Sequence, residues 1–176
     1  VWTTSWGAST RLIGGVIMTH GDDNGIILPP KIAPSHVALL PIIRKDKERD
    51  AVMRYTESLA QELKAITYNG QALQVEIDDR DIGGARGWDW IKKGIPLRVE
   101  IGPRDIANKS VFVGRRDKDP QERLSISRHQ FIKELITILD DMQTNLFKRA
   151  LAFRQAHTHI INDKSRFIEF FTPQNL

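Results

Sequence analysis

Apolar residues along the first half of the chain predict alternating strands and helices. An uninterrupted apolar run, HVALLPII at residues 36–43, is typical of a buried strand. Residues 47–66 carry apolar side chains three and four positions apart, which predicts an amphipathic helix that Asn69-Gly70 ends. The stretch LQVEID at 73–78 alternates between apolar and polar side chains, so we expect a half-buried strand there.

The second half of the chain continues this alternation. The aromatic stretch at 87–94 predicts one or two helical turns, and the alternating stretch at 95–102 predicts another strand with Arg98 and Glu100 on its polar face. Residues 110–116 and 123–128 can pair as an antiparallel hairpin. A long helix is expected over about 128–156, because these apolar residues keep a helical spacing: Ile132, Leu135, Ile136, Leu139, Met142, Leu146, Ala150 and Phe153.

Prolines divide the chain near its start. The apolar run LIGGVIM at 12–18 suits a buried strand or the start of a helix. Pro29, Pro30 and Pro34 favour an extended, helix-free path, so we expect a stiff linker and a domain boundary near 28–35. Beyond it, the order of elements predicts a three-layer α/β domain with a mixed sheet of roughly five strands flanked by helices.

Composition and charge narrow the class of protein. The formal net charge of +4 favours a polyanionic partner, and basic residues gather at 44–49, 86–104 and 114–118. The absence of cysteine excludes disulfides and thiolate metal sites and fits a reducing compartment. No apolar run is long enough to span a bilayer and no signal peptide opens the chain, so we expect no membrane partner and a cytoplasmic location.

Three short motifs could carry chemistry. The sequence DDRD at 78–81 could bind Mg²⁺ or form a solvated turn in which Arg80 offsets its neighbours. In EIGPRD, Arg104 and Asp105 could read a guanine, with Arg donating to O6 and N7 and the carboxylate accepting from N1 and N2, or could form a surface ion pair. In the stretch 87–94, tryptophans interleaved with lysines suit unpaired nucleotides, although Trp90 is also expected to face the core.

Metal and catalytic motifs are weak. The sequence HGDD at 20–23 lacks further ligands at metal-binding spacing, which favours a hydrogen-bonded loop histidine at His20. His157 and His159 lack further ligands in the same way. No Ser-His-Asp arrangement, P-loop or G-x-G-x-x-G is present.

Several stretches, taken together, resemble prolyl-tRNA synthetase, a class II aminoacyl-tRNA synthetase, in its archaeal and eukaryotic form: TSWGASTRLIGG, MTHGDDNGIILPPKIAPSHVALLPI, DDRD and KKGIPLRVEIGPRD. The resemblance runs from residue 1 to about residue 172. It implies that residues 1–28 end a class II catalytic domain and that 29–35 are a linker. It further implies that 36–156 form an anticodon-binding domain and that 157–176 begin a truncated C-terminal region.

The resemblance assigns the residues at the start of the chain to the catalytic site. Arg11 matches the motif 3 arginine that contacts ATP, which makes it the implied catalytic residue, and Ser9 matches a second nucleotide contact. Trp6 and Gly7 match residues near the proline pocket. A guanidinium at Arg11 can stabilise the triphosphate as charge shifts during adenylation.

The resemblance also assigns anticodon contacts. Proline anticodons share two guanines, and the family's readers of them fall on Arg98, Arg104 and Asp105, with Lys93 close by. Trp88 could stack on a base. The family's acidic anticodon contact falls on the apolar residue Ile91, because the segment 83–91 is shorter than the family pattern.

The implied parent enzyme uses ATP with Mg²⁺ to activate proline, transfers it to tRNA, and is a homodimer. Motifs 1 and 2 are absent from these residues, so we expect the 176-residue chain to bind the anticodon arm weakly, to need no cofactor or metal, and not to activate proline alone. It could be monomeric or associate through apolar residues near 12–18. Two alternatives stay open: a free-standing non-catalytic tRNA-binding module, and a related synthetase for histidine, threonine or glycine.

Overall fold

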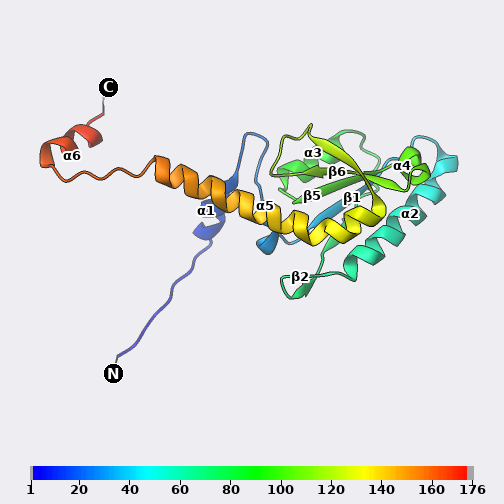
Figure 1. Cartoon of the computed structure of the whole chain (residues 1–176), viewed down its shortest axis with the longest axis horizontal. Helices are drawn as coiled ribbons and strands as arrows, with labels where there is room; N and C mark the ends of the chain where they lie inside the picture. The colour runs from blue at the N-terminus through cyan, green and yellow to red at the C-terminus, as the bar shows by residue number, and fades with distance from the viewer. Residues whose placement is uncertain (1, 174–176) are drawn as a thin grey trace.

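A mixed sheet of five strands, in the order β4-β1-β5-β6-β7, forms the centre of the molecule (Figure 1). The computed structural model describes residues 2–173. Strand β1 pairs in parallel with β4 and β5, whereas β5, β6 and β7 pair antiparallel. The predicted α/β fold with a five-stranded mixed sheet is therefore confirmed, with these strand bounds: β1 (Val37–Pro41), β4 (Val75–Ile77), β5 (Leu97–Ile101), β6 (Ser110–Arg115) and β7 (Arg123–Ser127).

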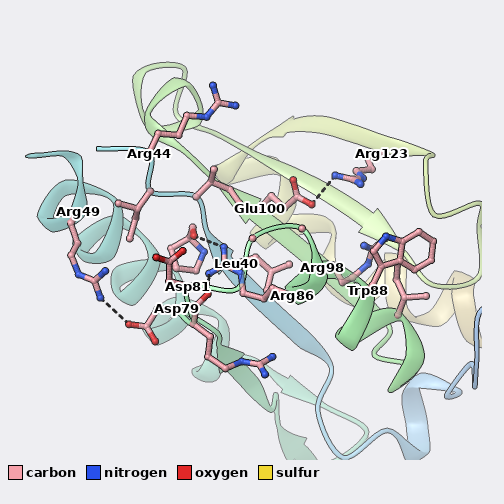
Figure 2. Close-up of a pocket in the computed structure, with 18 of the residues that line it drawn as sticks. Leu40, Arg44, Arg49, Asp79, Asp81, Arg86, Trp88, Arg98, Glu100 and Arg123 are labelled. Atoms are coloured by element: carbon pink, nitrogen blue, oxygen red, sulfur yellow. Dashed lines mark hydrogen bonds and ion pairs between the residues drawn. The ribbon is translucent and has the colours of Figure 1, made fainter. Parts of the chain in front are cut away.

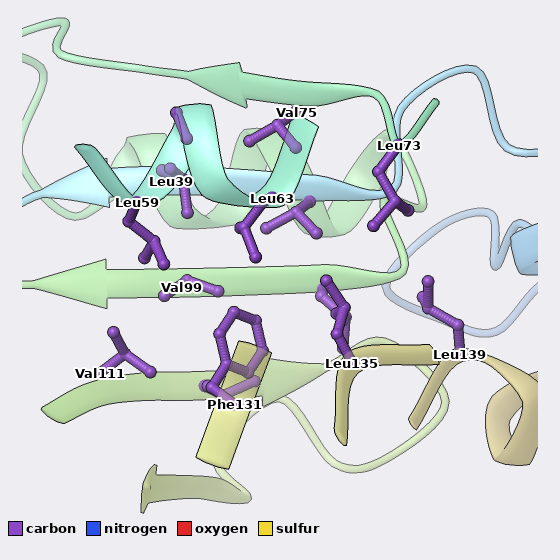
Figure 3. Close-up of a cluster of buried hydrophobic side chains, with 14 of the residues drawn as sticks. Leu39, Leu59, Leu63, Leu73, Val75, Val99, Val111, Phe131, Leu135 and Leu139 are labelled. Atoms are coloured by element: carbon purple, nitrogen blue, oxygen red, sulfur yellow. The ribbon is translucent and has the colours of Figure 1, made fainter. Parts of the chain in front are cut away.

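Two long helices cover one face of the sheet. Helix α2 (Asp46–Lys64) and the first half of helix α5 (Arg128–Ala156) bury their apolar stripes against alternate residues of the strands. Figure 3 shows Leu59 and Leu63 of α2 and Phe131 and Leu135 of α5 around Val99 of β5, and all five side chains are fully buried. This cluster is the main hydrophobic core.

A short helix covers the other face of the sheet and makes the third layer. Helix α3 (Ala85–Lys92) places Trp90 against a smaller buried cluster of Ala38, Leu40 and Ile95. Helix α4 (Pro103–Ala107) follows β5 directly. The predicted core position of Trp90 is thus confirmed, whereas the turn expected at IGPRD is a helix of five residues.

The segment around Asn69-Gly70 differs from its prediction. The helix ends earlier, at Lys64, and Asn69-Gly70 forms the turn of a small hairpin between β2 (Thr67–Tyr68) and β3 (Gln71–Ala72). Both turn residues have positive φ, 49° and 79°, which suits a two-residue turn of the primed type. The long helix, by contrast, spans 128–156 as predicted. Strands β6 and β7 also pair as the antiparallel hairpin that the sequence predicted.

The two ends of the chain extend away from the sheet (Figure 1). Helix α1 (Arg11–His20) lies beside α5 and contains no buried residue, so the predicted buried strand or helix at 12–18 is an exposed helix. Phe153, one of the helically spaced apolar residues that predicted this helix, is 66% exposed because the last turns of α5 pass beyond the sheet. Helix α6 (Lys164–Phe171) follows, and residues 174–176 of the predicted C-terminal region lie outside the described residues.

The proline-rich segment at 29–34 packs against the rest of the chain. Pro29 and Pro30 are buried, and a single 3₁₀ turn at Pro30–Ile32 replaces the helix-free path that the prolines predicted. The backbone N–H of Lys31 donates to Gln143 of α5 at 3.2 Å. In the described part of the chain, no helix combines the length and apolar character needed to cross a membrane.

Candidate nucleic-acid interface

An open cleft of about 580 Å³ lies where the parallel strands β1, β4 and β5 end (Figure 2). The carboxyl ends of parallel strands are the usual position of ligand sites in α/β sheets. Figure 2 shows Arg49 and Asp79 at one end of the cleft and Trp88, Glu100 and Arg123 at the other. Its lining includes four acidic side chains (Asp46, Asp79, Asp81 and Glu100) and seven basic ones (Arg44, Lys45, Arg49, Arg80, Arg86, Arg98 and Arg123).

Arg98 lies in the wall of this cleft and is the most unusual of its basic residues. Only 3% of it is exposed, although the sequence placed it on the polar face of its strand. Its Nε is buried, with no hydrogen-bond partner among residues 2–173. Burial, with the nearby Arg123 charge, lowers the pKa of the Arg98 guanidinium, which nevertheless stays protonated at neutral pH. A buried cation with an unsatisfied donor is costly, and a ligand with a hydrogen-bond acceptor would offset this cost.

Helix α3 forms the aromatic side of the cleft. Trp88 is about half exposed and lines the cleft, so its ring is available for stacking. The indole N–H of Trp90 donates to Asp78 at 2.7 Å, and the Lys93 ammonium lies 4.6 Å from the Trp90 ring centroid. Ile91 is only 2% exposed, so its side chain offers neither charge nor a hydrogen bond to a ligand.

Ion pairs hold two acidic residues of the DDRD loop. Arg80 donates to both carboxylate oxygens of Asp78, at 2.9 and 2.8 Å, and these bonds hold the pKa of Asp78 down to about 2. Asp78 is buried, so the interpretation of a solvated turn is wrong for this residue, although Arg80 does offset its charge. Asp79 pairs with Arg49 at 3.2 Å. In the described part of the chain, no three acidic, histidine or cysteine side chains converge as metal ligands.

Arg104 and Asp105 lie on α4, outside the lining of the cleft. Asp105 accepts a hydrogen bond from the backbone N–H of Gly102 at 2.8 Å, which caps the start of the helix. Arg104 is exposed and takes part in no ion pair within residues 2–173, so the surface-pair interpretation does not hold for these two residues. Among the predicted anticodon contacts, the structure thus brings Arg98 and Trp88 together in the cleft and places Lys93, Arg104 and Asp105 beyond it.

The predicted nucleotide and proline residues do not form a site with the rest of the described chain. Trp6 is 93% exposed, and no atom lies within 4 Å of the position that a Cβ on Gly7 would take. Arg11 is exposed, and its backbone N–H donates to Ser9 Oγ at 3.4 Å within the same turn. ATP bound at Ser9 and Arg11 would therefore contact no other part of the described chain, and these two residues alone do not form an ATP site.

An ion pair between a buried arginine and a partly exposed aspartate, which the sequence did not reveal, joins the HGDD loop to the sheet domain. Arg116 is fully buried and donates to both carboxylate oxygens of Asp22, at 2.7 and 2.6 Å. It also donates to the backbone oxygen of Ile91 in α3 at 3.0 Å. The Arg116 hydrogen bonds hold the pKa of Asp22 below its usual value. The only sequence signal was the basic cluster at 114–118, which does not tell a buried arginine from a solvated one.

His20, next to this loop, differs from its prediction. Its Nδ1 is buried and has no hydrogen-bond partner among the described residues, so the interpretation as a hydrogen-bonded loop histidine is wrong for this atom. Burial, with the charge of Arg149, lowers the pKa of His20.

Comparison with known proteins places this arrangement in a family. The anticodon binding domain family matches residues 36–138. The chain is 49% identical over 97% of its length to a proline–tRNA ligase of Bdellovibrio bacteriovorus, and 47% identical over 98% to proline–tRNA ligase 2 of Anaeromyxobacter dehalogenans. It spans about a third (34%) of the length of each of these relatives. The resemblance to prolyl-tRNA synthetase is thereby confirmed, and because the family match covers more than half of the chain, this protein belongs to the anticodon binding domain family.

Proposed function

We propose that this chain binds the anticodon arm of the tRNA for proline. The observation that carries the proposal is the buried Arg98, whose Nε has no hydrogen-bond partner among residues 2–173, in a cleft where basic side chains outnumber acidic ones. A guanidinium can donate to O6 and N7 of a guanine, and proline anticodons share two guanines. Trp88 would stack on an unpaired base at the rim of the cleft.

The remaining anticodon contacts would lie beside the cleft. Arg104 is exposed and free of ion pairs within residues 2–173, so it can donate to the second guanine. Asp105 has a second carboxylate oxygen that can accept from the base while the first caps α4. Lys93 would meet the phosphate backbone.

For the parent protein we propose ATP-dependent attachment of proline to its tRNA, by a homodimer in the cytoplasm. Relatives named proline–tRNA ligase support this activity. In the parent, Arg11 and Ser9 would contact ATP bound with Mg²⁺, and Trp6 and Gly7 would border the proline pocket. Residues 1–28 would end the catalytic domain, with 29–35 as linker, 36–156 as anticodon-binding domain and 157–176 as the start of a further region.

Binding to a synthetic anticodon stem-loop tests the proposal. We expect replacement of both guanines by adenine to weaken binding at least tenfold, measured by fluorescence anisotropy at fixed salt concentration. Equal binding to the two stem-loops would refute anticodon recognition. A pyrophosphate-exchange assay tests whether proline activation needs the rest of the parent protein. Proline-dependent exchange by these 176 residues alone would contradict this.

A further inference from the structure

Guanine recognition in the cleft requires an acceptor as well as a donor. Arg98 can meet only O6 and N7, whereas N1–H and the 2-amino group of guanine are donors and need a carboxylate or carbonyl. Ile91, which lines the cleft, is apolar and buried, so its side chain supplies no acceptor. The cleft therefore contains a donor for O6 and N7 of the base. The acceptor for N1–H and the 2-amino group has to come from a position other than 91.

Glu100 is the carboxylate that the fold places next to Arg98. The two residues are two positions apart on β5, so their side chains share a face of the sheet, and both line the cleft. The Glu100 side chain is 23% exposed, and its Oε1 accepts a hydrogen bond from Arg123 at 2.7 Å. Its Oε2 accepts no hydrogen bond from any residue in the described range 2–173. Another carboxylate of the lining, Asp79, pairs with Arg49 at the other end of the cleft (Figure 2).

A glycine makes room for this group of side chains. Gly114 of β6 lies directly opposite Arg98 on one side and Arg123 on the other. A Cβ on Gly114 would lie 3.1 Å from Arg98 Nη2 and 3.7 Å from Arg123 Cγ. Because Gly114 has no side chain, the two arginines can converge over it, with Glu100 beside them.

We propose that Glu100 accepts hydrogen bonds from N1–H and the 2-amino group of one anticodon guanine, while Arg98 donates to O6 and N7 of the same base. Arg123 is a positioning residue, because its ion pair fixes one carboxylate oxygen and orients the other toward the cleft. This inference rests on the proposed anticodon binding. It would give the chain two arginine–carboxylate pairs for two guanines: Arg98 with Glu100, and Arg104 with Asp105.

Inosine isolates the contact, because it keeps O6, N7 and N1–H of guanine and lacks only the 2-amino group. We expect the unmodified chain to bind the guanine stem-loop about tenfold more tightly than a stem-loop with inosine at one of the two shared positions. Glu100→Ala should reduce this ratio to near one at that position, and Glu100→Gln, which keeps one acceptor, should give an intermediate ratio. Arg123→Ala should lower the same ratio in part.

Further readouts separate recognition from folding. Replacing the same guanine by 7-deazaguanine removes N7 and reports on Arg98, so Glu100→Ala should still respond to it. Glu57→Ala, an exposed glutamate on α2, is the matched control and should leave every ratio unchanged. Thermal unfolding of each variant shows whether it is folded at the assay temperature.

The outcomes are distinct. A Glu100→Ala chain that keeps the guanine-over-inosine ratio at both positions overturns the role of Glu100. So does an unmodified chain that distinguishes guanine from adenine but not from inosine. A chain that binds guanine and adenine stem-loops equally overturns the proposed function and, with it, this inference.

Discussion

The sheet domain and the α1 segment of this chain differ in how their residues are held. Between residues 36 and 146, strands and helices bury two clusters of apolar side chains, and a loop anchored by Arg80 and Arg86 frames the cleft. Between residues 2 and 20, no side chain is buried, and apolar residues such as Leu12 and Met18 are exposed. A site built from side chains needs packing to fix them, so the cleft is organised and the strip around Arg11 is not.

The largest expected contrast concerns stability. Leu135→Ala removes a fully buried side chain from the main core and should lower the free energy of unfolding by about 4 kcal/mol. Leu12→Ala, the matched change on exposed α1, should lower it by less than about 0.5 kcal/mol. Urea denaturation followed by circular dichroism measures both values. Similar losses would show that α1 is as well packed as the core.

A second contrast concerns the loop that joins the two regions. Asp22→Ala leaves Arg116 buried with only backbone acceptors, so we expect a loss of about 3 kcal/mol in the free energy of unfolding. Asp23→Ala, at an exposed neighbouring carboxylate, is the control and should change it by less than about 0.5 kcal/mol. A small effect of Asp22→Ala in the same denaturation experiment would mean that the ion pair does not hold the loop to the domain.

Acid should weaken the wall of the cleft through Asp78. Its pKa is about 2 in the folded chain, below the ordinary value of 3.8, so the carboxylate contributes stability above about pH 4 that is lost as the pH falls toward 2. The difference in pKa corresponds to about 2 kcal/mol. Unfolding free energies at pH 6 and pH 2.5 should therefore differ by about 2 kcal/mol less in Asp78→Asn than in the unmodified chain. An unchanged pH dependence in Asp78→Asn would contradict the assignment.

The smallest expected effect concerns an exposed side chain near the cleft. Arg104→Ala should weaken binding to the proline anticodon stem-loop by about 1–2 kcal/mol, because one base contact is lost. Its stability should not change, since Arg104 is exposed and forms no ion pair within residues 2–173. Isothermal titration calorimetry measures the binding difference, with Lys109→Ala, between α4 and β6, as an exposed basic control. Equal binding by Arg104→Ala and the unmodified chain would remove Arg104 from the interface.

Hydrophobic spacing predicted the fold well where it reports local geometry. The helix over 128–156 and the hairpin of β6 and β7 follow from periodicity and turn residues alone. The same periodicity includes Phe153, which is 66% exposed, because spacing defines a face of a helix but not how far the sheet extends beneath it. Asn69-Gly70 was interpreted as a helix stop, although the same pair is also the strongest hairpin signal.

The candidate site was less predictable from sequence than the fold. The motifs and the family resemblance identified Arg98 and Trp88, which the structure brings to one cleft, although their roles stay predictions. Neither could reveal that Arg98 is buried or that Glu100 and Arg123 form an ion pair beside it, because these contacts depend on strand register across Gly114. Arg116 illustrates the same limit, since a charged residue in a basic cluster is usually solvated.

The comparison between the two regions can be tested with a pair of charge-conserving substitutions. Arg98→Lys and Arg11→Lys each keep a cation and remove the planar guanidinium that bonds a base through two donors. Binding to the proline anticodon stem-loop should weaken about tenfold for Arg98→Lys and stay within about twofold for Arg11→Lys. Equal losses for the two variants, or a larger loss for Arg11→Lys, would contradict the claim that the sheet domain contains the nucleic-acid site.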